Sequence, residues 1–202
     1  MRDPEIRQRL RQRLETEFGS DPTTLILDEL GVCCGRVRAD MAVVNGELKG
    51  FEIKSDEDTL LRLRSQISDY CKVFDTVSIV VGAKHFSQVR KIVPCWWGIL
   101  VAEGVPRSGI RCFRREQINP SPDAAAIAQL IWRDEAFMLL MAHGLHVGLR
   151  NKPRKFLWAA LVDNFQISDL KLIVRNQLKA RRDWRSVEPR KQDDAKSRPS
   201  SM

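Results

Sequence analysis

The sequence predicts a mixed α/β fold, with a mixed sheet flanked by helices and a small all-helical C-terminal module. Strand-like and helical segments alternate up to residue 118, whereas the residues between 123 and 183 keep helical spacing throughout. The stretch NPSPDA at 119–124 contains two prolines and small polar residues, which indicates a linker. We therefore divide the chain into 1–118, a helical module at 123–185 and a basic tail at 186–202.

The first part begins with an amphipathic helix over 4–18, which Gly19 and Pro22 end. Segment 23–32, TTLILDELGV, is predicted as a strand or the end of a helix. Alternating apolar residues on both sides of an Asn-Gly pair indicate a β-hairpin over 36–54. Beyond it the pattern predicts a helix over 57–74, a strand over 76–82, a helix over 83–92, a strand over 96–104 and an edge strand over 109–116.

The C-terminal module is predicted to contain helices over 123–147, 153–164 and 168–183, the second with Pro153 near its start. The tail offers almost nothing to bury, so we expect it to be disordered.

Composition favours a protein of the cytoplasm with a polyanionic partner. No apolar run reaches the roughly 18 residues that a membrane span needs, and the N-terminal residues are charged. The net charge is +8 and the pI is about 9.5, which favours nucleic acid. Much of the excess lies in 175–198, so a merely solubilising basic tail is the alternative.

The five cysteines are scattered and form no C-x-x-C pair, so a zinc site is not expected. We expect reduced and mostly buried thiols at Cys33, Cys34, Cys71, Cys95 and Cys112.

Two registers fit the hairpin. A two-residue turn at Asn45-Gly46 would put Asp40 and Glu52 on opposite faces of the sheet. A three-residue turn that extends to Glu47, with Gly46 left-handed, would instead pair Asp40 with Glu52. A slip of one residue turns every side chain over, and only the three-residue turn separates apolar from charged residues. We therefore predict the three-residue turn.

This register also pairs Arg38 with Lys54 and puts them beside the two carboxylates. The small residues Ala42 and Gly50 on that face would leave room for a ligand. The opposite face is predicted to carry the apolar residues Ala39, Met41, Phe51 and Ile53.

Two facing carboxylates on a partly buried sheet repel, and a divalent cation relieves that repulsion. Hard oxygen ligands suit Mg²⁺ or Mn²⁺. Lys54 points to the same face as Glu52, where it could orient a water or stabilise an oxyanion. Metal, water and ammonium together suit the hydrolysis of a phosphodiester. The alternative is a solvated strand face with cross-strand ion pairs.

Asp40, the Glu52-Ile53-Lys54 triplet twelve residues later and the following helix resemble the PD-(D/E)XK nuclease superfamily, with Ala39 in place of the proline. Gln66 and Tyr70 resemble the Q-x-x-x-Y element of its RecB-like branch. The resemblance covers residues 23–104. It implies a restriction-endonuclease-like core in a bacterial or phage protein of DNA repair or defence.

The resemblance also implies roles for single residues. Asp40 and Glu52 would bind the metal, with Glu29 or, less favoured, Asp28 as an upstream acidic ligand. Lys54 would serve the water, Gln66 would support the site, and Tyr70 would assist substrate binding. The implied activity is Mg²⁺-dependent hydrolysis of DNA. The alternative is a nucleic-acid-binding or adaptor protein that keeps a nuclease-like fold and does not cut.

Further contacts to nucleic acid are expected from Arg38 and from NKPRK at 151–155, which opens a helix and carries Lys152, Arg154 and Lys155. A solvated basic turn is the alternative for this segment. His143 and His146 have the spacing of metal ligands, but ordinary histidines at a helix end are the preferred interpretation. DNA is preferred over RNA, and the oligomeric state is left open.

Overall fold

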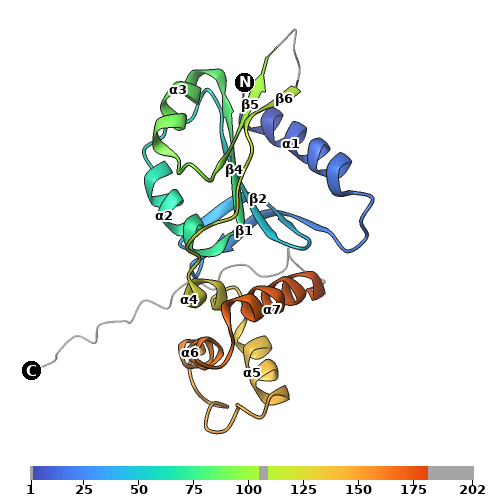
Figure 1. Ribbon diagram of the computed structural model, residues 1–202, viewed down its shortest axis with the longest axis vertical. Helices are drawn as coiled ribbons and strands as arrows, with labels where there is room; N and C mark the ends of the chain where they lie inside the picture. The colour runs from blue at the N-terminus through green and yellow to red at the C-terminus, as the bar shows by residue number, and fades with distance from the viewer. Residues whose placement is uncertain (1, 105–108, 182–202) are drawn as a thin grey trace, which may run out of the picture.

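The structure is a computed structural model that describes residues 2–104 and 109–181, and a six-stranded mixed sheet forms its centre (Figure 1). The strands lie side by side in chain order. Antiparallel pairing joins the first three strands, parallel pairing joins the third to the fifth, and the sixth is antiparallel at the edge. The strands are β1 (Leu25–Val32), β2 (Val37–Val44), β3 (Leu48–Lys54), β4 (Thr76–Gly82), β5 (Gly98–Glu103) and β6 (Gly109–Arg114).

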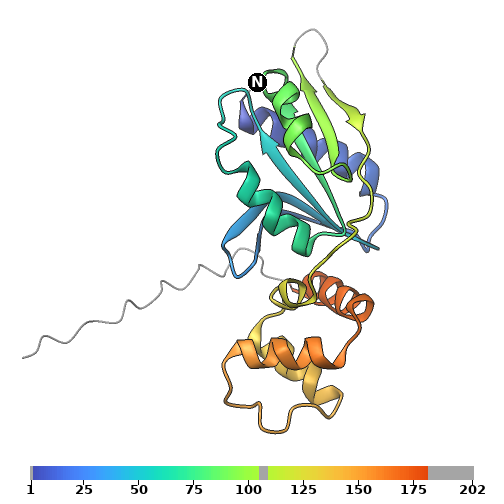
Figure 2. The same ribbon diagram turned by 60° about the vertical axis from the view of Figure 1, so that its left-hand side comes forward.

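Helices cover both faces of this sheet. Figure 1 shows α1 on one side and α2 and α3 on the other, with the last four helices packed together below the sheet. Figure 2 shows the same separation from another direction. The helices are α1 (Asp3–Phe18), α2 (Leu63–Val73), α3 (Ala83–Ile92), α4 (Ala124–Ala128), α5 (Arg133–Ala142), α6 (Arg154–Asn164) and α7 (Ile167–Ala180).

Each face of the sheet has its own apolar cluster. The smaller cluster lies under α1 and combines Ile6, Leu10 and Leu14 with sheet residues such as Met41 and Phe51. The larger cluster lies under α2 and α3 and continues without a break into the C-terminal helices. The mixed α/β prediction with C-terminal helices is therefore confirmed, while the domain boundaries stay predictions.

The hairpin has the predicted three-residue register. Met41 pairs with Phe51, and Val44 pairs with Leu48. The expected left-handed Gly46 is wrong, because the only described glycines with positive φ lie elsewhere. Asn45 closes the turn instead: its side-chain oxygen accepts from the Glu47 N–H at 3.0 Å, so the glycine needs no unusual conformation.

At Glu29 of β1 and Asp40 of β2, the alternation of side chains between the two faces of the sheet shifts by one residue. The apolar pattern of the sequence did not predict this shift. Ala39 was expected on the face of Met41, yet it belongs to the larger cluster while Met41 belongs to the cluster under α1. In β1, Leu27 and Leu30 likewise face the same cluster although they are three residues apart. Glu29 lies between them with φ of 55°, a left-handed backbone that absorbs the extra residue.

The space expected beside Gly50 is filled. A Cβ on Gly50 would lie 2.8 Å from the ring of Phe74, so the glycine is needed for close packing of Phe74 on β3. The prediction that this position leaves room for a ligand is therefore wrong.

Two helices begin or end away from their predicted limits. Helix α2 starts at Leu63 because the preceding residues form turns, in which the Asp58 carboxylate accepts from the Ser55 N–H at 2.7 Å. The helix predicted over 123–147 is broken into α4 and α5. The second starts afresh at Trp132, whose N–H donates to the Glu135 side chain at 2.8 Å.

Asp75 joins the C-terminal helices to the sheet. Its carboxylate accepts from the Leu48 N–H at 2.7 Å, and Lys171 and Arg175 of α7 lie 2.8 and 3.5 Å from its oxygens. The predicted tail over 186–202 lies outside the described residues.

The thiols are more exposed than expected, since Cys34, Cys95 and Cys112 are exposed and the other two are half-buried. Among the described residues, no helix has the length and apolar character needed to cross a membrane.

Candidate functional site

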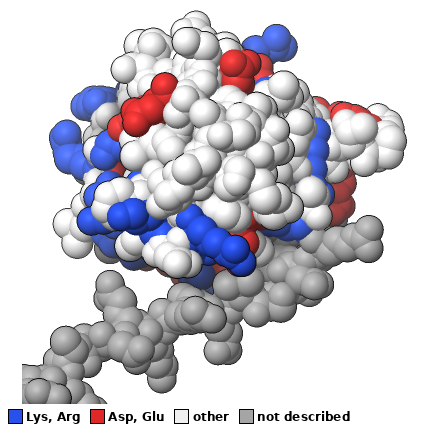
Figure 3. Space-filling model, turned by 90° about the horizontal axis from the view of Figure 1, so that it is seen from below, with Lys and Arg blue, Asp and Glu red and all other residues white. Residues whose placement is uncertain are grey.

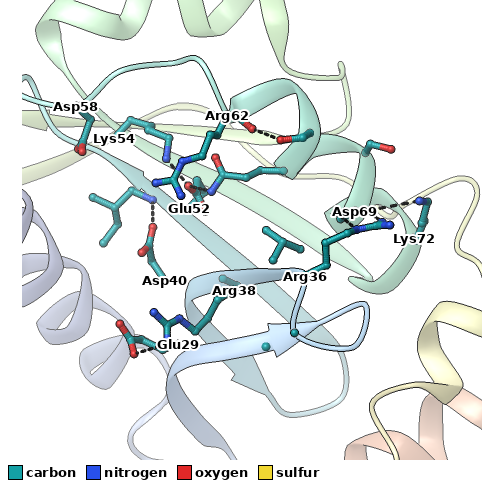
Figure 4. Close-up of a pocket in the computed structure, with 18 of the residues that line it drawn as sticks. Glu29, Arg36, Arg38, Asp40, Glu52, Lys54, Asp58, Arg62, Asp69 and Lys72 are labelled. Carbon is teal, nitrogen blue, oxygen red and sulfur yellow. Dashed lines mark hydrogen bonds and ion pairs between the residues drawn. The ribbon is translucent and has the colours of Figure 1, made fainter. Parts of the chain in front are cut away.

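The charged residues singled out in the hairpin line one pocket. Its volume is about 1060 Å³, and it opens between the ends of β2 and β3 and helix α2. Figure 4 shows Asp40, Glu52 and Lys54 directed into the same region, with Glu29 and Arg38 at its edge. Gln66 of α2 also lines the pocket. The sequence therefore identified side chains that the fold brings together.

Glu52 is the centre of a buried hydrogen-bond network. Only 1% of the residue is exposed. Its Oε1 accepts from Lys54 Nζ and from Gln66 Nε2, both at 2.5 Å. Its Oε2 accepts from the Tyr70 hydroxyl at 2.5 Å. All three donors come from β3 and α2, so the packing of this helix on this strand builds the network.

Burial and neighbouring charges shift the ionisation of this network. Burial raises the pKa of Glu52, and the charge of Asp40 raises it further, while the ammonium of Lys54 opposes both. Burial and the nearby Glu52 carboxylate likewise raise the pKa of Tyr70, so its hydroxyl stays a hydrogen-bond donor. A buried acid with a raised pKa in a pocket is a general mark of a candidate functional site.

Asp40 is held by partners of its own. Its Oδ1 accepts from Arg7 of α1 at 2.8 Å, and its Oδ2 accepts from the Ile53 N–H at 2.7 Å. The bond from the Ile53 N–H takes the place of a backbone hydrogen bond between β2 and β3, because the pairing of these two strands ends at this point. The carboxylate of Asp40 therefore also has a structural role, since it caps the open end of the hairpin.

The candidate upstream acids lie on β1, not on a helix. Glu29 pairs with Arg38 at 3.3 Å at the edge of the pocket, and both side chains are exposed. Asp28 pairs with Arg11 at 2.5 Å and is not among the residues lining the pocket. Tyr70 is fully buried, so its position suits support of Glu52 better than direct contact with nucleic acid.

Several residues at this site escaped the sequence reasoning. Arg36 pairs with the buried Asp69 of α2 on the pocket wall, and Arg62 lines the pocket just before α2 begins. Arg7 lies 33 residues before its partner Asp40. The only local signal for Arg7 was its spacing from Asp3 on α1, where the two groups pair at 3.6 Å.

The donor set of the pocket does not form a ready metal site. Every carboxylate oxygen of Asp40 and Glu52 already accepts a hydrogen bond, and Arg7 and Lys54 neutralise the two charges. Within the described ranges, no group of three or more His, Cys, Asp and Glu side chains is arranged to hold a metal ion. A cation would compete with Arg7 and Lys54 for these two carboxylates, and the expected Mg²⁺ or Mn²⁺ stays a prediction.

The other predicted contacts to nucleic acid lie on the C-terminal helices. The exposed residues Arg150, Lys152, Arg154 and Lys155 are here called the basic end. They occupy the α5–α6 loop and the first turn of α6. Figure 3, which views the protein from this side, shows Lys and Arg side chains gathered along the lower left of the face.

Aromatic rings lie among the cations of the basic end. Lys152 and Lys155 lie 5.6 and 5.2 Å from the centre of the Phe156 ring. Arg154 lies 5.0 Å from the ring of Trp158, whose indole N–H donates to Ile131 at 2.9 Å. This hydrogen bond attaches the first half of α6 to the turn between α4 and α5, where Ile131 lies.

The two nearby histidines are engaged separately. Nδ1 of His143 lies 2.9 Å from the Leu139 carbonyl, and its ring packs against Phe165. The ring of His146 packs against Phe137. These contacts agree with the preferred interpretation of ordinary histidines after a helix.

Comparison with known proteins gives one curated relative with a clear match. Protein cII of Enterobacteria phage P4 is 42% identical over 81 residues, which are 40% of this chain and 30% of that protein. The matched part thus spans less than a third of the relative's length. No solved structure matches the chain.

A family model described as bacteriophage P4 protein cII matches residues 1–201. This match overturns the assignment to the PD-(D/E)XK nuclease superfamily, and with it the prediction of a Mg²⁺-dependent deoxyribonuclease. The spacing of Asp40, Glu52 and Lys54 misled because an Asp followed by a Glu-x-Lys triplet occurs by chance in many unrelated chains. The chain belongs to the family of bacteriophage P4 protein cII.

Proposed function

We propose that this protein binds nucleic acid through the basic end, without cutting it, and that DNA is the ligand. The observation that carries the proposal is the charge pattern of residues 136–162. This segment contains four cations, Arg150, Lys152, Arg154 and Lys155, and no Asp or Glu. All four are exposed. Unopposed cations on one surface attract phosphates and release counterions on binding.

Elsewhere on the described surface, Lys and Arg side chains form ion pairs with carboxylates more often than they do in the basic end. Arg11, Arg36 and Arg38 each have a carboxylate partner. In such a pair the carboxylate largely cancels the positive potential of the cation. The four cations of the basic end therefore contribute more to the attraction of a polyanion than their number among all Lys and Arg residues suggests.

The start of α6 adds a second attraction for phosphate. Pro153 is its N-cap, no side chain caps this end, and its first turn contains no acidic residue. The N–H groups of a helix start carry partial positive charge and bind anions. Helix α5, by contrast, has Asp134 and Glu135 in its first turn.

The test is DNA binding by the full chain, measured by fluorescence anisotropy with a labelled oligonucleotide. We expect K152E/K155E to weaken binding more than about tenfold, because two phosphate contacts become repulsive. K91E/R115E is the matched control, since Lys91 and Arg115 are exposed on the sheet part and the charge change is equal. Equal losses in both variants would show that only net charge matters and would refute the basic end as the interface.

The finer description of the fold as restriction-endonuclease-like also stays a proposal, supported by the parallel order of β3, β4 and β5 after a hairpin. We assign no reaction to the pocket around Glu52, and the roles predicted there for Asp40, Lys54 and Gln66 stay predictions.

A further inference from the structure

Phe156 is an exposed aromatic ring in the first turn of α6. Its relative exposure is 44%, and it belongs to neither apolar cluster. The next residue, Leu157, is fully buried and anchors the helix in the larger cluster. The fold therefore does not need the Phe156 ring for its core.

The surroundings of the ring are cationic. Lys152 approaches it from the loop and Lys155 from the helix, at 5.6 and 5.2 Å from the ring centre. An aromatic face beside two ammonium groups offers one surface for a base and charges for the phosphates on either side of it.

The form of nucleic acid that can use such a ring is limited. In a duplex each base is stacked between its neighbours, so a ring on a protein surface finds a free base face only in a single strand or a flipped-out nucleotide. Stacking also tolerates any sequence, because every base has a flat face.

Resting on the proposed binding of nucleic acid at the basic end, we infer that this surface prefers single strands. One base stacks on Phe156, and Lys152 and Lys155 hold the adjacent phosphates. Phe156 is thus the residue that distinguishes single-stranded from double-stranded nucleic acid, whereas the cations attract both.

The experiment compares a labelled 20-nucleotide thymidine strand with a mixed-sequence 20-base-pair duplex by anisotropy at fixed salt. F156L keeps apolar volume but removes the flat ring, and F156W restores one. F113L is the matched control: Phe113 is also 44% exposed and lies near a cation, Arg90 at 5.8 Å, but on β6. Thermal unfolding by circular dichroism verifies that each variant is folded.

We expect F156L to weaken binding of the strand about tenfold and binding of the duplex less than about twofold. F156W should bind like the wild type, and F113L should change neither affinity. If F156L leaves strand binding intact, or weakens strand and duplex equally, single-strand preference through Phe156 is refuted while binding at the basic end stands. If the wild type binds neither probe, the proposed function itself fails.

Discussion

Lys54 and Glu52 form a buried ion pair two residues apart on one face of β3, with Nζ and Oε1 separated by 2.5 Å. Their side chains are only 8% and 1% exposed. Burial makes each charge depend on the other, because an unpaired charge in this position would lose its hydration without compensation. This dependence gives the first prediction.

Removing either partner should cost more than removing both. We expect E52Q or K54M alone to lower the free energy of unfolding by about 3–5 kcal/mol, and E52Q/K54M to lie closer to the wild type. Urea denaturation followed by circular dichroism measures all four proteins. Additive losses in the double variant would mean that the pair has no coupling energy.

The stability contributed by Glu52 should depend on pH. Burial raises the pKa of Glu52 above its ordinary value of 4.5, so the folded protein holds this proton at pH values where the unfolded chain has lost it. Between 4.5 and the raised value, stability therefore falls as pH rises. Relative to the wild type, E52Q/K54M should lack this part of the decline when urea unfolding is measured at pH 4.5 to 8. Parallel curves for the two proteins would argue against a raised pKa.

Asp75 should be needed to dock α7. Replacing it with Asn keeps an acceptor for the Leu48 N–H but leaves Lys171 and Arg175 without a counter-charge. We expect D75N to lower the free energy of unfolding by roughly 3 kcal/mol. D163N is the control, since Asp163 is exposed and should change stability by less than about 0.5 kcal/mol. Thermal and urea unfolding would both register the difference.

The predicted divalent cation has a direct test. Because Arg7 and Lys54 already neutralise Asp40 and Glu52, we expect millimolar Mg²⁺ or Mn²⁺ to leave the melting temperature nearly unchanged. A cation present at 100 times its Kd would add about 2.7 kcal/mol, which scanning calorimetry detects easily. A rise in melting temperature that disappears in D40A would show that the pocket binds metal after all.

The salt dependence of DNA binding should match the number of cations in the basic end. With four phosphate contacts to a single strand, the slope of log K against log salt concentration is expected to be about −3. K152E/K155E should roughly halve this slope, because two contacts are lost. Anisotropy titrations at several salt concentrations give both slopes, and a slope near zero in the wild type would exclude phosphate binding.

The register of the hairpin could be predicted because local alternation decides it. One choice of turn buried Met41 and Phe51 together, and the structure has that pairing. The change of side at Glu29 and Asp40 could not be predicted, since it needs matching irregularities in two neighbouring strands. The helical spacing of apolar residues similarly predicted α5, but it did not predict that a turn separates α5 from α4. Ile127, Leu130 and Ile131 continue the helical spacing of apolar residues across that turn.

The sequence allowed the residues around Glu52 to be predicted, but not the partner that Asp40 has on α1. The spacing of Glu52 and Lys54 on a strand puts both on one face, and Gln66 and Tyr70 are one helical turn apart. The Arg7 that engages Asp40 comes from α1, and no local pattern in the sequence connects the two. A spacing motif therefore located the charged groups but could not show that they satisfy one another, and it did not identify the family to which the chain belongs.

The attachment of α7 through Asp75 also shapes how the protein meets a polyanion. Lys171 and Arg175 count toward the formal charge of +8, but they point inward to a carboxylate. The cations of the basic end have no acidic residue near them in sequence. On the proposed binding at the basic end, these unpaired cations would orient an approaching nucleic acid toward the α5–α6 loop, whereas Lys171 and Arg175 would contribute little to the attraction.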